Sequence, residues 1–542
     1  MAVNGPLGRG EGLGAGVLAR LALRRERAIA PWWILTIVAL ALVMVSYIRT
    51  NMATYELKLA YLQVIDASAF LHALGGGVVE PRLEVLATWR SGGFLYVASA
   101  FAAVLSVVRH TRREEDAGRS ELVLSGTVGR HAPLTAAVLV AGGISLAGGA
   151  LTAAVLIGMG LEPTGSLAYG AAIAVAGWVF GGVAAVAAQL VRNAHTATAI
   201  GLTVLAVAYV TRFAADATGQ TWLTWLTPIG WSHLVRPYQE ERWWVLGLSA
   251  LVAAILYAVA YALLDRRDLG SGLLPERLGR ASALELRGPV SLAWRLHRAL
   301  LARWAVGVAA FAAVGGALSP LTRDLLSRPS VVVDNITHFL GVPMGATQLA
   351  AYSWYLILIL AYAVALYPVL MTLRLRSEET SGRAETLQAT PMTRLRWAGG
   401  HLLVTALGTA GLMALAGVVF GTVYSLLVGD LATDLPAFVA GALSTVPAAW
   451  CVGAVCVLAY GLLPRASVAL SWLVWTLTAV LGQVVGPLYG LWGGSPAEPF
   501  HYVGNAIIGT PFALGPTAGL ITTTALLAAA GLLALHHRDF GA

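Results

Sequence analysis

The chain has 542 residues, of which 58% are hydrophobic and only 11% are charged, and its mean hydropathy is +0.74. Because soluble globular proteins carry about 25% charged residues, this composition excludes a soluble domain and indicates a protein of the lipid bilayer. The net charge of +8 does not indicate a nucleic-acid-binding protein, because the basic residues are sorted by side of the membrane and not gathered in one patch.

Twelve segments of the chain are apolar and about long enough to cross the hydrocarbon core as helices. They lie at about 31–49, 93–110, 134–158, 168–190, 197–214, 243–264, 301–319, 353–374, 399–425, 436–462, 467–487 and 515–535. We therefore expect an all-α polytopic membrane protein built from two tandem six-span halves, residues 1–270 and 271–542.

Each half is expected to begin with an amphipathic helix on the membrane lipid. In the first, at about 15–28, Arg20, Arg24 and Arg27 share one side of a helix and apolar residues occupy the other. The linker and second amphipathic helix are expected at about 271–300, where Pro289 suits a first helical turn.

The distribution of basic residues predicts the orientation. With both termini in the cytoplasm, 26 of the 35 basic residues lie on the cytoplasmic side and 9 outside, which agrees with the positive-inside rule. The long outer segments 50–92 and 320–352 have periodic apolar positions, and we expect them to form short helices on the outer leaflet.

A charged motif occurs twice, after the second span of each half. Its residues are Arg112, Glu114, Glu115, Gly118, Arg119, Glu121 and Arg130 in the first half, and Arg376, Glu378, Glu379, Gly382, Arg383, Glu385 and Arg394 in the second. Each residue of the second copy follows its counterpart by 264 positions. Topology alone does not require this order twice, so we interpret loops 111–131 and 375–396 as paired docking elements for a cytoplasmic partner.

The first loop is expected to present one helical face to that partner. Glu114, Gly118 and Glu121 share a face if the segment is a continuous helix, and the glycine there would let the backbone approach closely.

A second pair of anchors also indicates an internal duplication. Thr227-Pro228 corresponds to Glu498-Pro499, and Arg267-Asp268-Leu269-Gly270 corresponds to Arg538-Asp539-Phe540-Gly541. The offset is 271 at both anchors, so we expect a short insertion in the second half, for example near 486–496.

Several kinds of chemistry are missing from the sequence. The only lysine, Lys58, is not in a Walker motif, so the chain has no phosphate-binding loop of its own. No metal site is expected, and Cys451 and Cys456 are interpreted as core thiols. All acidic residues are assigned to loops or span ends, which argues against proton coupling, although His401 near a span start leaves that alternative open.

The duplicated loop motif, the Pro228-Ile229-Gly230-Trp231 turn and the Arg-Asp-Leu/Phe-Gly ends resemble the tetronasin-type ABC-2 exporter permeases of actinobacteria, over nearly the whole chain. The resemblance implies a type V exporter-like fold in the bacterial cytoplasmic membrane. It implies ATP-driven export of hydrophobic antibiotics, such as polyether ionophores, or other drugs. Two copies of a separate ATPase subunit would bind ATP and Mg²⁺, and the two motif loops would insert into them as coupling helices.

Aromatic residues on the second span, on its counterpart in the second half (the eighth span) and on the eleventh span are candidates for the substrate pathway, because an aromatic lining suits a hydrophobic molecule. They are Phe94, Tyr96, Phe101, Tyr352, Trp354, Tyr355, Tyr362, Trp472 and Trp475. Helix packing and interfacial belts are the alternative explanation for each of them.

Two other functions compete with an exporter permease, which would not be an enzyme by itself. A secondary, ion-coupled multidrug transporter with two six-span halves would work without an ATPase and would need an ionisable group inside the membrane. A membrane-embedded lipid enzyme would need a polar cluster near an interface, and the sequence shows none. A neighbouring gene for an ATPase with Walker motifs would favour the exporter.

Overall fold

The computed structural model describes residues 13–67, 73, 75–76, 80–275, 286–321, 348–428, 430–480, 482, 496, 498–504, 507 and 514–538, and every element in these ranges is a helix. Eleven of the described helices are long and apolar enough to cross a membrane, and α23 (Ser467–Val480) is a shorter apolar helix. The prediction of an all-α polytopic membrane protein is confirmed. The rest of the expected eleventh span and the expected insertion lie almost wholly outside the described residues.

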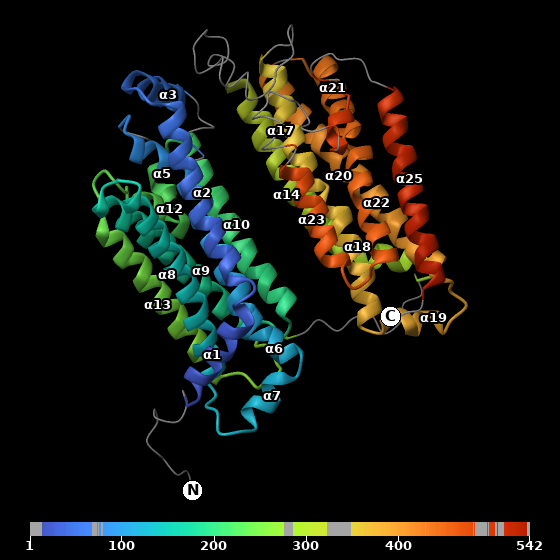
Figure 1. The fold of residues 1–542 in the computed structure, drawn as a ribbon, viewed down its shortest axis with the longest axis horizontal. Helices are drawn as coiled ribbons and strands as arrows, with labels where there is room; N and C mark the ends of the chain where they lie inside the picture. Colours follow the sequence, from blue (N-terminus) through green and yellow to red (C-terminus); the bar gives the residue numbers. More distant parts are fainter. Residues whose placement is uncertain are drawn as a thin grey trace. The chain divides into compact units, whose positions relative to one another are not determined.

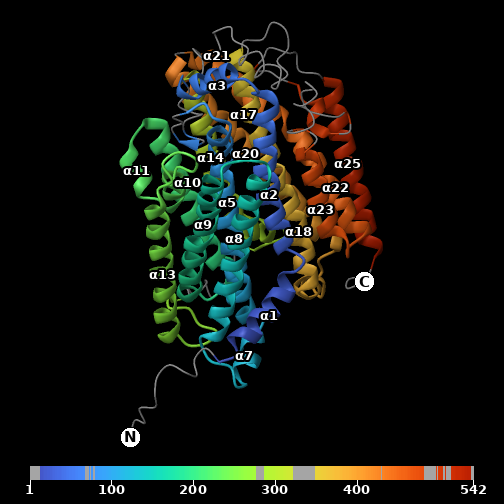
Figure 2. The same cartoon turned by 60° about the vertical axis from the view of Figure 1, so that its left-hand side comes forward.

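The chain divides into two compact units, Met1–Gly279 and Arg280–Ala542. In the first unit, α1, α6 and α7 lie at one end of the long helices and α3 lies at the opposite end (Figures 1 and 2). Its helices are α1 (Ala15–Glu26), α2 (Ala30–Asn51), α3 (Tyr55–Ala67), α5 (Leu83–His110), α6 (Arg112–Asp116), α7 (Arg119–Leu124), α8 (Ala132–Gly158), α9 (Pro163–Leu190), α10 (Ala194–Thr218), α11 (Thr221–Trp225), α12 (Pro228–Leu234) and α13 (Trp243–Asp265).

In the second unit, α19 and the end of α25 lie at one end and α21 lies at the other (Figure 1). Besides α23, its helices are α14 (Pro289–Leu321), α17 (Gln348–Val364), α18 (Leu366–Thr380), α19 (Arg383–Gln388), α20 (Arg394–Val428), α21 (Leu431–Ser444), α22 (Val446–Leu462), the 3₁₀ helix η2 (Pro499–Tyr502) and α25 (Leu514–His537). The expected outer segment 320–352 lies mostly outside the described residues.

Small residues set the packing of the long helices, as is common between helices in membranes. Gly149 of α8 faces Gly170 of α9 so closely that a Cβ built on Gly149 would sit 2.2 Å from the Gly170 carbonyl oxygen. The two backbones are therefore in contact, and any larger residue at position 149 would force α8 and α9 apart. Proline occupies the first turn of both helices, at Pro133 and Pro163, where its missing N–H costs no hydrogen bond.

The second span begins earlier than the sequence predicted. We expected it at 93–110, but α5 starts at Leu83. The prediction was wrong because Arg90 was taken as a residue outside the helix. In the structure, Arg90 donates to the Tyr61 hydroxyl, and its guanidinium carbon lies 5.4 Å from the centre of the Tyr47 ring. These contacts stabilise the charged side chain of Arg90 within α5.

The amphipathic segments at the start of the two units differ. The first is a separate helix, α1, which ends at Glu26 before α2 begins at Ala30. The second was also predicted as a separate helix, but from Pro289 onward it continues without a break into the seventh span as α14, a helix of 33 residues. Between Pro289 and the expected start of the seventh span at about residue 301, the sequence has no glycine or further proline. This explains why the helix continues.

Candidate functional site

The first motif loop consists of two short helices and not the single helix that was expected. α6 ends at Asp116, α7 begins at Arg119, and Gly118 between them has a φ of 70°. That left-handed conformation favours glycine, which has no Cβ to clash with the backbone. Glu114, Gly118 and Glu121 therefore do not share one helical face, and the prediction that they do was wrong. Gly382, with a φ of 73°, makes the same break between α18 and α19.

The first glutamate of each motif braces its own loop. Glu114 accepts hydrogen bonds from Arg119 at 2.7 and 2.8 Å and from Arg25 of α1 at 2.6 Å, so it also ties the loop to the amphipathic helix. In the second unit, Glu378 accepts from Arg383 at 2.7 Å across the same turn. The Glu-x-x-x-Gly-Arg spacing closes each turn with an ion pair over the left-handed glycine.

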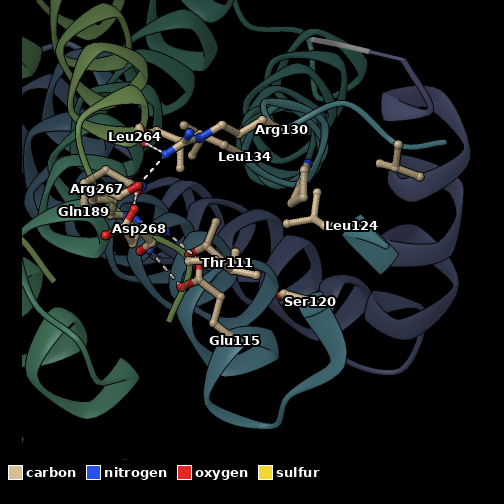
Figure 3. A pocket seen from close by; sticks show the side chains of 13 residues that line it. Thr111, Glu115, Ser120, Leu124, Arg130, Leu134, Gln189, Leu264, Arg267 and Asp268 are labelled. Carbon is tan, nitrogen blue, oxygen red and sulfur yellow. Dashed lines mark hydrogen bonds and ion pairs between the residues drawn. The ribbon is translucent and has the colours of Figure 1, made fainter. Parts of the chain in front are cut away.

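The second glutamate of the first motif points into its unit. Arg267 donates to both Glu115 carboxylate oxygens, at 3.0 and 2.5 Å, and Arg112 donates to Glu115 at 2.8 Å. Arg267 also donates to the Gln189 side-chain oxygen at 2.7 Å. The loop is thus joined to the residues that follow the sixth span and to the end of α9, as Figure 3 shows. Arg130 adds hydrogen bonds to the carbonyl oxygens of Leu264 and Arg267.

The second unit repeats this arrangement. Arg538 donates to both oxygens of Glu379, at 2.8 and 2.6 Å, and the Tyr460 hydroxyl donates to Glu379 at 2.5 Å. The Arg538 guanidinium also lies 4.9 Å from the centre of the Tyr460 ring. Arg394 donates to the Arg538 carbonyl, as Arg130 does to that of Arg267. We call the Glu115–Arg267 and Glu379–Arg538 pairs the two clasps.

The clasps connect two sequence features that the sequence alone left separate. Arg267 and Arg538 were recognised only as parts of repeated chain ends, and Gln189 and Tyr460 were not singled out. A signal was present, because Gln189 and Tyr460 also stand 271 positions apart. Arg112 and Arg376 differ, however: Arg112 is buried and Arg376 only reaches the Arg465 carbonyl from a more exposed place.

The outward side of each loop is formed by other residues of the motif. Glu121 and Glu385 are exposed, as are the side chains of Arg119 and Arg383 at 50% and 61%. Leu122, next to Glu121, is 78% exposed, which is unusual for a large apolar side chain beside charges. A partner that contacts these loops would therefore meet arginine, glutamate and an apolar side chain, and not the clasp carboxylates.

A recess of about 330 Å³ lies beside the first clasp (Figure 3). Its walls combine the clasp with apolar side chains from α7, the start of α8 and the end of α13. The lining residues are Thr111, Glu115, Ser120, Leu124, Val128, Arg130, Pro133, Leu134, Gln189, Leu264, Arg267, Asp268 and Leu269. In the part of the chain that the structure describes, no group of three His, Cys, Asp or Glu residues could hold a metal ion.

The amphipathic helix of the first unit is fixed to the second span by a buried carboxylate. Glu26 is 2% exposed and contacts His110 at 2.9 Å and Arg109 at 3.3 Å. Burial by itself raises the pKa of Glu26, but the His110 hydrogen bond and the Arg109 charge outweigh it and lower the pKa overall. In the second unit His297 of α14 instead contacts His401 of α20 at 2.9 Å.

The candidate pathway aromatics have different surroundings. Tyr96, Trp354 and Tyr362 are buried in their own units, and Tyr96 packs edge-on against His233 with ring centroids 4.9 Å apart. Phe101 packs against Trp33 at 5.8 Å. Tyr352, Tyr355 and Trp475 are half-buried, whereas Phe94 and Trp472 are 51% and 41% exposed.

Comparison with known proteins extends these observations over both units. The family model described as "Multidrug efflux system permease Rv1217c, C-terminal domain" matches residues 17–264 and 286–536. The multidrug efflux system permease protein Rv1217c of Mycobacterium tuberculosis (strain ATCC 25618 / H37Rv) is 38% identical over 529 residues, which cover 96% of this chain and 94% of that protein. Both motif loops lie within the matched stretches.

Proposed function

The chain belongs to the multidrug efflux permease family of Rv1217c, and from this premise we propose that it is the membrane-spanning permease of an ATP-driven exporter of hydrophobic drugs. In this proposal one permease chain works with two copies of a separate ATPase, which hold ATP and Mg²⁺. Both termini lie in the cytoplasm. The mechanism is that of the tetronasin-type ABC-2 permeases, which the chain resembles. The chain itself hydrolyses nothing.

The observation that carries the proposal is the pair of clasped loops. Each loop exposes charged side chains on one side, and on the other side its clasp glutamate is joined to the chain directly after the last span of the unit. A force applied to the exposed side would reach that span through short ion pairs without first bending a flexible loop. Two such loops in one chain support two ATPase partners.

One observation favours the ion-coupled transporter as a second candidate. The sequence suggested that every acidic residue lies in a loop or at a span end, yet Glu498 is 1% exposed inside the second unit. A secondary transporter requires a group of this kind. An ATPase requirement for export decides between the two candidates.

The test uses the exposed side of the loops. Glu121→Arg with Glu385→Arg reverses two exposed charges and leaves the clasps intact, so we expect normal membrane expression, weaker co-purification of the ATPase and reduced drug survival. Rim charges at a docking surface act mainly through association rate and salt dependence, and salt screens exposed charges, so the loss should be largest at low salt and shrink at high salt. The partner to co-express is a candidate ATPase with Walker motifs from a neighbouring gene.

The matched control is Glu162→Arg, which changes an exposed glutamate at the opposite end of the first unit, before α9. It should hold the ATPase as wild type does. The mass of the purified complex should correspond to one permease and two ATPases. Retention of the ATPase and full resistance in the loop double mutant would contradict the docking role, and export that survives a hydrolysis-dead ATPase would favour ion coupling.

A further inference from the structure

Four acidic residues are nearly fully buried in the described part of the chain: Glu26, Glu378, Glu379 and Glu498. The first three each have an arginine within 3.3 Å. No arginine, lysine or histidine side chain contacts Glu498 among the described residues. A buried carboxylate without a cation is strongly disfavoured in its charged form, so Glu498 needs a proton or a positive ligand.

Hydrogen bonds hold one oxygen of the Glu498 carboxylate but not the other. Glu498 caps η2, and its Oε1 accepts from the Tyr362 hydroxyl at 2.8 Å and from the Phe500 backbone N–H at 3.1 Å. The other oxygen, Oε2, is buried and has no hydrogen-bond partner within the described ranges. A native protein rarely leaves such an atom without a partner unless the site has a further use.

The carboxylate is hydrogen-bonded to a residue near the middle of a candidate membrane span. Tyr362, which holds it, is 13 residues from Leu349 and 18 from Thr380, the ends of the candidate span. At 1.5 Å per residue these separations correspond to about 20 and 27 Å along the helix. An acidic group at that depth is expensive to keep and is a candidate functional site in any membrane protein.

The other unit shows that the cap itself does not need a charge. Thr227 stands at the position that corresponds to Glu498, and its hydroxyl accepts from the Gly230 backbone N–H at 3.1 Å. A neutral oxygen therefore makes the turn before α12. Capping the turn therefore does not explain the additional carboxylate of the second unit.

The tyrosine that holds the carboxylate packs against other aromatic side chains. The Tyr362 and Phe500 rings have centroids 4.2 Å apart, and Trp475 donates its indole N–H to the Tyr362 carbonyl at 3.0 Å. Aromatic faces attract organic cations, and a nearby carboxylate adds full charge complementarity. This combination selects a lipophilic cation over a neutral molecule or a small hydrated ion.

We propose that Glu498, with Tyr362 and Trp475, forms a membrane-embedded site for the cationic group of lipophilic drugs, such as an amine or quaternary ammonium. The empty site holds a proton on Glu498, and binding of the cation releases that proton, so charge is balanced at each stage. The site deepens the proposed function, on which it rests, by naming a substrate class.

The helices packed against this site carry few charged residues. α17 and α23 carry no Asp, Glu, Lys or Arg, and the same is true of α22 and α25. The remaining titratable residues on η2 and on the helices packed against the site are Tyr352, Tyr355, Tyr362, Cys451, Cys456, Tyr460, His501, Tyr502, His536 and His537. The proton released on cation binding is therefore assigned to Glu498.

The test is equilibrium binding of tetraphenylphosphonium, a permanently charged lipophilic cation, to the purified full-length chain in lipid nanodiscs. Wild type should bind more tightly as pH rises and should release a proton into weakly buffered solution. Glu498→Gln should weaken binding about tenfold or more and remove the pH dependence. Glu162→Gln, which alters an exposed glutamate outside both motif loops and outside this site, is the matched control and should behave as wild type.

Binding of the neutral probe N-phenyl-1-naphthylamine reports whether Glu498→Gln is folded, and it should change less than twofold. Unchanged tetraphenylphosphonium affinity in a folded Glu498→Gln protein overturns the proposal. If the variant does not fold, the absence of proton release by wild type overturns it instead. Failure of the proposed function is distinct, because it would appear as export of neutral drugs that does not depend on the ATPase.

Discussion

The clasp of the first unit and the clasp of the second join the same two parts of the fold with different third residues. Gln189 accepts a hydrogen bond from Arg267, whereas Tyr460 donates one to Glu379 and stacks its ring beside Arg538. The glutamate and the arginine are unchanged while their neighbour differs in chemistry. This comparison teaches that the link between loop and last span is the retained feature, and that its surroundings are free to vary.

The largest effect is expected from cutting a clasp. Arg267→Leu leaves Glu115 beside Arg112 alone, and breaking a buried ion pair typically costs about 3–5 kcal/mol. Arg538→Leu should cost less, because the Arg538 side chain is 12% exposed and that of Arg267 is 3% exposed. Thermal unfolding of the purified full-length proteins measures both.

A double variant separates stability from coupling. Glu379→Gln with Arg538→Leu removes both charges of the second clasp, whose glutamate is not shared with Arg376, so much of the lost stability should return while export stays impaired. The comparison would fail if Arg538→Leu destabilised the protein more than Arg267→Leu, or if the double variant exported drugs at the wild-type rate.

An intermediate effect is expected at the third residues. Tyr460→Phe removes one hydrogen bond to a charged group, a loss of about 1.5–3 kcal/mol, but keeps the ring beside Arg538. Gln189→Leu removes the acceptor of Arg267 and should cost a similar amount. If chemical denaturation showed no change for either variant, the clasp would be the glutamate–arginine pair alone.

The smallest effect is expected at the left-handed glycines. Gly118→Ala and Gly382→Ala meet nothing within 4 Å, so their cost is backbone strain of about 1–2 kcal/mol. Gly143→Ala is the matched control, because it also meets nothing within 4 Å but lies inside α8, where alanine is preferred. Melting temperatures should fall for the first two and not for the third. Equal shifts in all three would show that the loop turns are not strained.

The sequence was most informative where a pattern is local or repeated. Hydropathy located the spans, and the fixed offset found both motif loops before any contact was known. It did not reveal the clasps, because Glu115 and Arg267 are 152 residues apart and nothing local connects them. It also placed Glu498 in a loop, which is correct along the chain, but a loop that turns into the unit buries its residues as deeply as a span does.

The two units differ at this inward turn. In the first unit Thr227 caps the turn, and Arg212 pairs with Asp216 at 2.5 Å within α10. In the second, Glu498 contacts a tyrosine and, among the residues that the structure describes, no arginine. Charges are balanced within the first unit and left open in the second, so a difference between the units in drug preference would originate here and not at the clasps.

The continuous helix α14 has a mechanical consequence. Its 33 residues extend about 50 Å, well beyond the roughly 30 Å of a bilayer core. If a helix of that length tilts as a rigid body about a point between its ends, a movement at Pro289 moves the other end in the opposite direction. In the first unit the helix is broken at Arg27 to Ile29 instead, so α1, which Glu26 holds to the second span, can move with that span independently of α2. Identical movements of the two motif loops would therefore be transmitted rigidly to the first span of the second unit and less directly to the first span of the first unit.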